Sequence, residues 1–376
     1  MRAEGPASIA LAHEWLVHRY GSEKTFEAMA ETFPAADLYA LTHDRSAPLD
    51  FGGREVSTTL LDRLPVVRDQ RELQLPLMPL AWRYATRRRY DVVVTSSHAC
   101  AKGFWPGRSA LHLCYCYTPM RYVWLDSVDR RRPLSRPEQA AARLLRRWDR
   151  SSIRWVDGFA AISSAVADRV RLAYDREARV IHPPVATDFF MPPPATAAGR
   201  AGENEFALVV SRMVPYKRVD LAIRACRENG IRLVVAGSGP EEGALRALAA
   251  ELGADVSFVI SPDDEALRDL YRRARVVLFL ADEDFGIVTV EAQACGTPVV
   301  ALARGGSLDT VVPGVTGVLV PDQSEAAAAK GLEEALATVF DAGRCRAQAE
   351  RFSAPRFRSE FGGWVREAAA ARGLEA

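Results

Sequence analysis

The chain has 376 residues and a formal net charge of +1, with 48% hydrophobic and 26% charged residues. This length exceeds one ordinary core and predicts two domains of roughly 180 residues each. No run of about 18 apolar residues occurs, and the first residues lack the apolar stretch of a secretory signal. We therefore expect no membrane-spanning segment and a cytoplasmic location. The balanced charge also excludes nucleic acid as the expected partner.

The six cysteines are scattered among apolar neighbours. Cys114 and Cys116 are two residues apart, but no second Cys/His pair at ligand spacing accompanies them, so a zinc site is not predicted. Small buried side chains in a reducing compartment explain them better.

The first half alternates short β-type runs with helical patterns, which is typical of a parallel α/β domain. The predicted strands are Ala7–His13, Asp91–Thr95, Ala110–Cys116, Gly158–Ile162 and Ala178–His182, and the predicted helices are Arg136–Arg154 and Ser164–Ala173. After the first strand, Gly21 and Ser22 precede a helix predicted over Glu23–Thr32. A glycine loop before a helix start suits a phosphate, although an ordinary turn explains the same residues equally well.

A strongly basic stretch runs from Arg121 to Arg154, with ten arginines against four acidic residues. Its apolar side chains Leu144, Leu145 and Trp148 lie among Arg143, Arg146, Arg147 and Arg150. One interpretation is a helix at the surface of an anionic membrane, which would make the protein peripheral to that membrane. The other is a solvated helix whose aliphatic stems cover the edge of the core.

The clearest boundary is a proline-rich break. His182-Pro183-Pro184 ends a strand, and Met191-Pro192-Pro193-Pro194 runs into small and polar residues, which cannot continue a helix or a strand. We predict an N-terminal domain over residues 1–190 and a C-terminal domain over residues 200–354. A final helix over about 355–376 is expected to pack back onto the first domain.

The second half is predicted to be doubly wound, with its ligand outside the carboxyl ends of the strands. The predicted strands are Glu205–Val210, Ile231–Ala236, Val256–Ile260, Val276–Leu280 and Pro298–Leu302. Directly after the first of them come Ser211 and Arg212, followed by Lys217. Two cations beside a strand end form a natural diphosphate clamp. Only four of the 49 basic residues are lysines, so a lysine kept at position 217 indicates a flexible point charge.

The segment with the strongest functional signal follows the strand Val276–Leu280 and reads Asp282-Glu283-Asp284-Phe285-Gly286-Ile287-Val288-Thr289-Val290-Glu291. A helix that begins near Ile287 would leave free N–H groups around Gly286–Val288 for an anion. Glu283 would then lie in the loop, and Glu291 would point back from the first turns of the helix. Two carboxylates beside an anion site suit a phosphate flanked by sugars. A rival interpretation makes the two glutamates the acid–base pair of a glycosidase, but it leaves Arg212 and Lys217 without a role.

Two glycine loops follow other strand ends of the second half. Gly237 comes after Ile231–Ala236, and Gly305-Gly306 comes after Pro298–Leu302. Glycines permit tight turns and a close approach of the backbone to a ligand. The first loop is weak evidence alone, because any strand–helix junction resembles it.

Together these segments resemble the family-4 glycosyltransferases of the GT-B fold over nearly the whole chain. The similarity is carried by Arg212 and Lys217, by the two spaced glutamates with Phe285-Gly286 between them, and by Gly305-Gly306 with Thr316-Gly317. Four further segments resemble bacterial GDP-mannose-dependent mannosyltransferases: His13-Glu14-Trp15, Ser96-Ser97-His98-Ala99, Cys114 to Arg121, and Pro183-Pro184-Val185.

The resemblance implies two Rossmann-like domains facing a cleft and a retaining, metal-independent hexosyltransferase without a cofactor. The donor would be a nucleoside-diphosphate sugar, and the acceptor a glycan, a lipid-linked glycan or a small molecule. Arg212 and Lys217 would hold the diphosphate, Glu283 the donor sugar and Glu291 the ribose. Ser211, Gly237, Phe285, Gly286, Ile287 and Val288 would contribute to donor binding, and Gly21 and Ser22 would face the phosphate.

Two departures from the family pattern stand out. Relatives carry a histidine that contacts the donor sugar where this chain has Tyr117, and paired glycines are common where it has Tyr20-Gly21-Ser22. We predict that Tyr117 signals an altered donor sugar. Two other classes stay open: a GT-B isomerase that epimerises a nucleotide sugar, and a non-catalytic nucleotide-sugar-binding relative.

Overall fold

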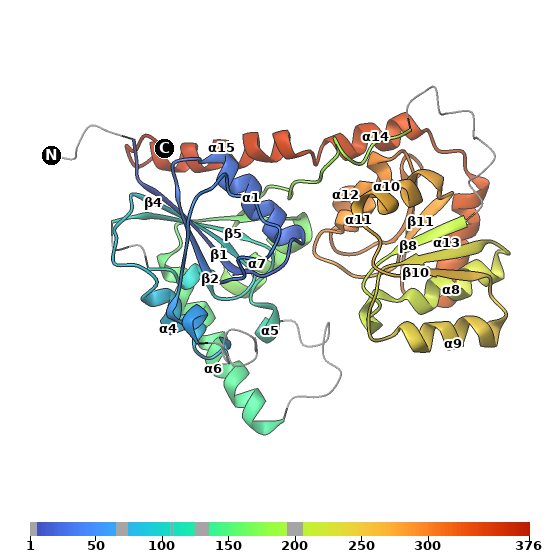
Figure 1. The fold of residues 1–376 in the computed structure, drawn as a ribbon, viewed down its shortest axis with the longest axis horizontal. Coiled ribbons are helices and arrows are strands. Elements are labelled where there is room, and N and C mark those ends of the chain that lie inside the picture. Colours follow the sequence, from blue (N-terminus) through green and yellow to red (C-terminus); the bar gives the residue numbers. More distant parts are fainter. Residues whose placement is uncertain (1–5, 65–73, 106, 108, 125–134, 194–205) are drawn as a thin grey trace. The chain divides into compact units, whose positions relative to one another are not determined.

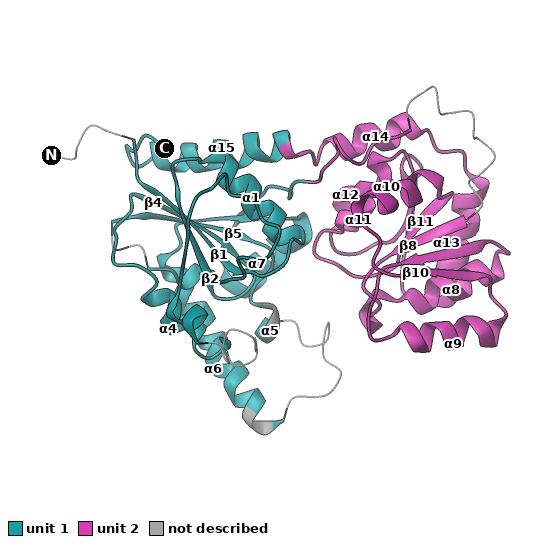
Figure 2. Ribbon diagram, viewed as in Figure 1, with its two compact units in different colours: residues 1–184, 355–376 teal, residues 185–354 magenta. Residues whose placement is uncertain are grey.

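The computed structural model describes residues 6–64, 74–105, 107, 109–124, 135–193 and 206–376. The chain divides into two compact units (Figure 2). Unit 1 comprises Met1–Pro184 and Pro355–Ala376, and unit 2 comprises Val185–Ala354. The division falls at the end of the His182-Pro183-Pro184 segment, six residues before the predicted limit at residue 190. Among the described residues, no helix combines the length and the apolar character that crossing a membrane requires.

Unit 1 is built on a seven-stranded parallel sheet in the order β3-β2-β1-β4-β5-β6-β7 (Figure 1). Its strands are β1 (Ile9–Leu16), β2 (Asp37–His43), β3 (Val56–Thr58), β4 (Val92–Ser97), β5 (Leu111–Cys116), β6 (Gly158–Ala161) and β7 (Ala178–Val180). The described helical segments that connect them are α1 (Gly21–Thr32), η1 (Leu60–Arg63), α4 (Met78–Arg83), η2 (Ala101–Gly103), α5 (Arg121–Trp124), α6 (Arg136–Ser152), η3 (Ile153–Trp155) and α7 (Ser164–Tyr174).

The last helix, α15 (Ala354–Ala370), packs on unit 1 through aromatic side chains. Phe361 is fully buried, and its ring lies 5.9 Å from that of Phe33 and 6.2 Å from that of Tyr115. At the surface, Arg358 pairs with Glu31 at 2.6 Å. Burial of aromatic rings stabilises such contacts far more than an exposed ion pair does.

Unit 2 has a six-stranded parallel sheet in the order β10-β9-β8-β11-β12-β13. The strands are β8 (Phe206–Val210), β9 (Arg232–Ala236), β10 (Val256–Val259), β11 (Val276–Phe279), β12 (Val299–Leu302) and β13 (Gly317–Val320). The helical segments are η5 (Pro215–Lys217), α8 (Val219–Glu228), α9 (Glu242–Leu252), α10 (Asp264–Arg273), α11 (Ile287–Ala294), α12 (Ser307–Thr310), α13 (Glu325–Ala337) and α14 (Ala342–Glu350).

Several helices begin at a side-chain cap that the sequence supplies. Asp263, Ser324 and Asp341 each accept a hydrogen bond from the backbone N–H three residues on, at the starts of α10, α13 and α14. Ser163 does the same for α7. Each such cap contributes about 1 kcal/mol, because it satisfies one of the orphan donors of the first turn.

The predicted α/β class with two doubly wound domains is confirmed, whereas some predicted elements were wrong in extent or missing. Strands β2, β3 and β13 were not predicted; β3 is only three residues long, too short for a period-two pattern to show. Strand β1 continues to Leu16, three residues beyond the prediction, and includes the charged Glu14. Helix α1 begins at Gly21 rather than at Glu23.

Candidate functional site

The order of strands in unit 2 defines where a ligand is expected. The first strand of unit 2, β8, is followed on one side by β9 and β10. The chain then crosses to the other side of β8, where it forms β11. In doubly wound sheets, ligands bind outside the carboxyl ends of the strands at such a switch point. The segments that follow β8 and β11 carry the predicted clamp and the predicted glutamates, so the topology brings both segments to the same edge.

The loop after β8 presents one exposed cation. Arg212 is exposed, and its side chain makes no hydrogen bond or ion pair with the part of the chain that the structure describes. The neighbouring Ser211 hydroxyl donates to the Arg212 carbonyl at 2.8 Å and so stiffens the turn. An exposed guanidinium at a strand end is available to bind an anion.

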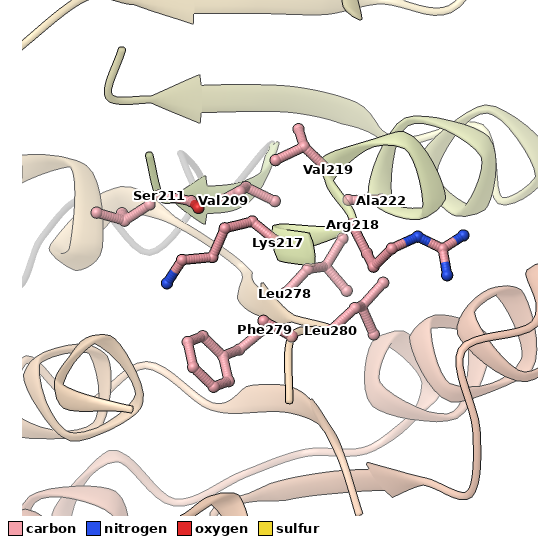
Figure 3. Close-up of a pocket in the computed structure, with 11 residues that line it drawn as sticks. Val209, Ser211, Lys217, Arg218, Val219, Ala222, Leu278, Phe279 and Leu280 are labelled. Carbon is pink, nitrogen blue, oxygen red and sulfur yellow. The ribbon is translucent and has the colours of Figure 1, made fainter. Parts of the chain in front are cut away.

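Lys217 lies beside a carboxylate at the same edge. Its ammonium nitrogen forms an ion pair with Glu283, which is in the loop after β11, and the two side chains retain only 15% and 21% of their exposed surface. Figure 3 shows that the Lys217 and Arg218 side chains point in opposite directions. Both line a small pocket, which Leu278, Phe279 and Leu280 also line. Arg218 pairs with Asp220 at 3.0 Å instead. The structure thus brings Lys217 and Glu283 together across the β8–β11 switch point.

Helix α11 begins at Ile287, as predicted, and its start is shaped by a glycine. Gly286 has a φ of +86°, and a Cβ there would lie 3.0 Å from the Phe279 ring. Any other residue at this position would be destabilising, because it would have to adopt the left-handed backbone and its Cβ would press against the Phe279 ring. Within the part of the chain that the structure describes, the N–H groups of Ile287 and Val288, the first two of α11, form no hydrogen bond, which favours an anion.

Glu291 lies one turn into α11, and its carboxylate accepts a hydrogen bond from a tyrosine of another helix. The Tyr271 hydroxyl, from α10, donates to its Oε2 at 2.8 Å. Burial, together with the adjacent Glu291 carboxylate, raises the pKa of Tyr271 well above its usual value, so Tyr271 remains a neutral donor. Because Glu283 and Glu291 have a lysine and a tyrosine as partners, the glycosidase interpretation gains no support.

The glycine-containing loops after β9 and β12 pack closely against the backbone of neighbouring loops at this edge of the sheet. A Cβ on Gly306 would lie 2.2 Å from the Phe285 Cα, and one on Gly305 would lie 2.1 Å from the Glu283 carbonyl oxygen. The Gly306 N–H donates to that same carbonyl at 2.8 Å. Gly237 likewise has a φ of +138° and packs against the Ser211 carbonyl. These glycines therefore allow the loops to lie backbone against backbone.

The predicted residues of unit 1 form a separate group. The Tyr117 hydroxyl, at the end of β5, donates to the Ser22 carbonyl and accepts from Ser96 Oγ, both at 3.0 Å. Gly21 is the first residue of α1 and has no positive φ, so the expected loop before the helix is replaced by the helix itself. Burial is the main reason that the pKa of Tyr117 is raised above its usual value. Tyr117 is thus a neutral hydroxyl that ties β5 to the start of α1.

A cluster at the β1–β4 switch point of unit 1 was given no role by the sequence analysis. Glu14 is fully buried and lies 3.4 Å from His98 Nδ1. Nearby, Lys102 Nζ lies 2.7 Å from Asp149 Oδ1, and both side chains are buried. The rarity of lysine, which singled out Lys217, applies equally to Lys102 and would have been the signal to find it.

Two further expectations are not tested by the structure. Asp282-Glu283-Asp284 is formally an Asp-x-Asp triplet, so the predicted metal independence rests on the family resemblance alone. In α6, Leu145 and Trp148 pack against the unit 1 core, and Arg146 donates to the Val123 carbonyl. Of the apolar side chains that suggested a membrane surface, Leu144 alone is exposed, at 67%. The described part of α6 is therefore largely committed to the core edge.

Two family models match the chain. Residues 20–189 match the model described as Glycosyltransferase Family 4, and residues 196–351 match Glycosyl transferases group 1. The first match covers β2 to β7 of the unit 1 sheet and leaves out β1, and the second covers the whole sheet of unit 2. The chain is thus a GT-B protein of the group 1/family 4 glycosyltransferase type, with one domain model for each half.

The chain is also similar to curated relatives over a shorter length. It is 43% identical over 170 residues to the D-inositol 3-phosphate glycosyltransferase of Kribbella flavida, covering 40% of each chain. It is 41% identical over 155 residues to that of Mycobacteroides abscessus, covering 38% of this chain and 35% of the relative. The chain therefore aligns with about two fifths of the length of these relatives.

Solved structures share the fold over nearly the whole chain. Sucrose-phosphate synthase from Thermosynechococcus elongatus matches with a TM-score of 0.71 at 21% identity, covering 96% of this chain and 99% of that one. The lipopolysaccharide outer core galactosyltransferase WaaB matches with a TM-score of 0.68 at 17% identity, covering 97% and 99%. At such identities the likeness defines the GT-B fold and leaves the substrate open.

Proposed function

We propose that this chain is a retaining, metal-independent hexosyltransferase that uses a nucleoside-diphosphate sugar, with GDP-mannose as the first donor to test. The single observation that carries the proposal is the charge arrangement at the β8–β11 edge. There, an exposed Arg212, the Lys217–Glu283 pair and the start of α11 occupy one switch point. The group 1 model matched by this unit and the nucleotide-sugar chemistry of such folds support it.

In this proposal, unit 2 holds the donor. Arg212 and Lys217 bind the diphosphate and stabilise the negative charge that develops on it as the sugar departs. The backbone N–H groups at Gly286–Val288, which form no hydrogen bond among the described residues, contribute to the same anion site. Glu283 orients Lys217 and accepts hydrogen bonds from donor-sugar hydroxyls, and Glu291, held by Tyr271, accepts from the ribose.

Unit 1 is assigned to the acceptor, which is a glycan, a lipid-linked glycan or a small molecule with a free hydroxyl. Some relatives are named for inositol 3-phosphate, which makes that compound one acceptor to test among others. Because each aligns with under half of this chain, the acceptor is treated as open. Peripheral contact with an anionic membrane is kept as a lesser proposal through Arg143, Leu144 and Arg147 of α6, which remain exposed.

The decisive experiment removes each cation in turn. Arg212→Ala and Lys217→Ala are each expected to lower kcat/KM by on the order of 10²- to 10³-fold. Both should also shrink the rise in melting temperature that GDP produces, since a ligand stabilises only the state that binds it. Arg344→Ala and Lys330→Ala, which remove exposed cations of α14 and α13, are the matched controls. Full nucleotide affinity and full activity in both site variants would refute the proposal.

A panel of GDP, UDP, ADP and dTDP in the same thermal-shift assay identifies the base. Slow hydrolysis of the donor without acceptor separates a working transferase from a GT-B isomerase and from a non-catalytic binding protein. Neither of these two alternatives is favoured by an observation in the structure.

A further inference from the structure

The β1–β4 edge of unit 1 contains a buried carboxylate that is saturated with donors. Glu14 has no exposed surface. It accepts hydrogen bonds from Ser97 Oγ, from the Ala99 N–H and from the Ala101 N–H, each at 2.9 Å, and from the His98 N–H at 3.3 Å. Such a network fixes the carboxylate in one orientation and leaves it no freedom to bind a ligand directly.

The charge on Glu14 is stabilised within the fold. Burial alone would raise its pKa, but His98, His13 and the N–H groups of Ala101 and Ala99 outweigh burial, so the pKa is lowered. A buried anion is tolerated only when its surroundings are arranged around it. Glu14 therefore places a negative charge beside a side chain that is partly exposed to solvent.

That side chain is His98. Its Nδ1 lies 3.4 Å from Glu14 Oε2, and the side chain retains 26% of its exposed surface. The ring is held between aromatic neighbours, with centroids 5.1 Å from Trp15 and 6.0 Å from Tyr117. A carboxylate beside Nδ1 keeps the proton on that nitrogen and leaves Nε2 with its lone pair. Among the described residues, no hydrogen bond is formed by Nε2.

His13, the neighbouring imidazole, cannot take this role. Tyr117 donates its only hydroxyl hydrogen to the Ser22 carbonyl, so Ser96 must donate to Tyr117, and His13 Nδ1 must then donate to Ser96 Oγ at 3.0 Å. This leaves His13 Nε2 without a proton as well, but His13 is fully buried, so a ligand does not reach it. Of the two imidazoles at this edge, His98 is the one that solvent and a ligand can reach.

We propose that His98 binds the acceptor in unit 1, with Nε2 accepting a hydrogen bond from the acceptor hydroxyl, and that Glu14 is the positioning residue that fixes the His98 tautomer. The inference rests on the proposed function and adds a named contact for its second substrate. It also states the chemistry of that contact, which is a neutral hydroxyl donor. The β1–β4 edge is the switch point of the unit 1 sheet, where doubly wound domains bind ligands.

The first test observes the imidazoles directly. In protein labelled with ¹⁵N only at histidine, long-range proton–nitrogen spectra should show His98 protonated at Nδ1 and bare at Nε2. Methyl α-D-mannopyranoside, added at millimolar concentration as a hydroxyl probe, should move the Nε2 resonance of His98 and leave that of His112 in place. A proton on Nε2, or no response of His98 to the probe, would overturn the proposal. This test needs no donor and is independent of the proposed function.

The second test compares transfer with hydrolysis. His98→Phe keeps the ring and removes Nε2, so transfer from GDP-mannose to the same probe should fall about tenfold relative to donor hydrolysis, as expected for one lost hydrogen bond. His98→Gln, which retains an acceptor atom, should recover part of the ratio. His43→Gln, at the end of β2, serves as the control.

The two kinds of failure are distinguishable. GDP affinity, measured by thermal shift, should be the same in wild type and in His98→Phe, since the proposal places the nucleotide in unit 2. An unchanged ratio of transfer to hydrolysis in His98→Phe sinks the role of His98 and leaves the donor site intact. Loss of GDP binding in that variant would also contradict the assignment of the two substrates.

Discussion

In unit 2 the switch point carries an exposed arginine and a partly exposed lysine–glutamate pair, whereas in unit 1 the same position in the sheet carries groups that are mostly buried. Glu14, His13 and the Lys102–Asp149 pair have almost no exposed surface. Charge that faces solvent is available to a ligand, while charge that is buried and fully partnered mainly fixes the geometry around it. One topology therefore presents accessible charge in one unit and buried, partnered charge in the other.

The two units also differ in composition in a way that helps experiments. All six histidines and all seven tryptophans lie within residues 1–184 and 355–376, so unit 2 has neither residue. Titration of histidine between pH 5 and 8 is therefore confined to unit 1. Tryptophan fluorescence likewise follows the unfolding of unit 1 and does not report on unit 2.

The largest effect is expected from breaking the buried ion pair of unit 1. Lys102→Met leaves Asp149 buried without its cation and should lower the free energy of unfolding by about 3–5 kcal/mol. Urea unfolding followed by tryptophan fluorescence measures it. Lys102→Met combined with Asp149→Leu should cost less than the single change. Arg171→Met, which breaks an exposed pair with Asp168, should cost below about 1 kcal/mol. Equal costs for the buried and the exposed pair would contradict the comparison.

The second prediction concerns pH. Burial lowers the pKa of His112 from 6.5 to about 4, so the folded protein holds this ring neutral while the unfolded chain binds a proton. The free energy of unfolding is therefore independent of His112 titration above pH 6.5. It falls by about 3 kcal/mol in total as the pH falls from about 6.5 to about 4.

Unfolding by urea across that window measures this effect as the difference between wild type and His112→Gln. The variant retains a donor for Thr95 Oγ1, which lies 3.2 Å from Nε2. The exposed His18 provides the control, because His18→Gln should run parallel to wild type. A constant difference between wild type and His112→Gln at all pH values would refute the prediction.

A smaller effect is expected in unit 2, where backbone packing sets the loops. Gly306→Ala forces a Cβ to within 2.2 Å of the Phe285 Cα, so the loop must shift at a cost of about 1–3 kcal/mol. The rise in melting temperature with GDP should shrink as well. Circular dichroism is the suitable probe, since unit 2 lacks tryptophan. Gly243→Ala, on the open face of α9, should be neutral or stabilising by about 0.5–1 kcal/mol; similar behaviour of both variants would argue against the packing role.

The smallest effect concerns Tyr117. Tyr117→Phe removes one hydroxyl that bridges Ser22 and Ser96 and should cost about 1 kcal/mol in tryptophan-monitored unfolding. Tyr84→Phe, 70% exposed, should change stability by less than about 0.5 kcal/mol. The prediction that Tyr117 alters the donor sugar is tested separately with Tyr117→His; an unchanged preference for GDP-mannose would end it.

The sequence by itself determined the α/β class, the doubly wound second half, and the start of α11 at Ile287. These follow from local patterns: apolar runs, proline breaks and the Phe285-Gly286 turn. Arg212, Lys217 and Glu283 could be proposed as one site because parallel strands bring their carboxyl ends to a common edge.

Tertiary structure alone decided which partners those residues have. The ion pair of Lys217 with Glu283 spans 66 positions, and that of His98 with Glu14 spans 84. Neither short-range periodicity nor composition encodes such distances. Whether a charge is buried or exposed depends on what packs above it, which is why the same lysine signal marks a partly exposed ion pair at position 217 and a buried ion pair at position 102.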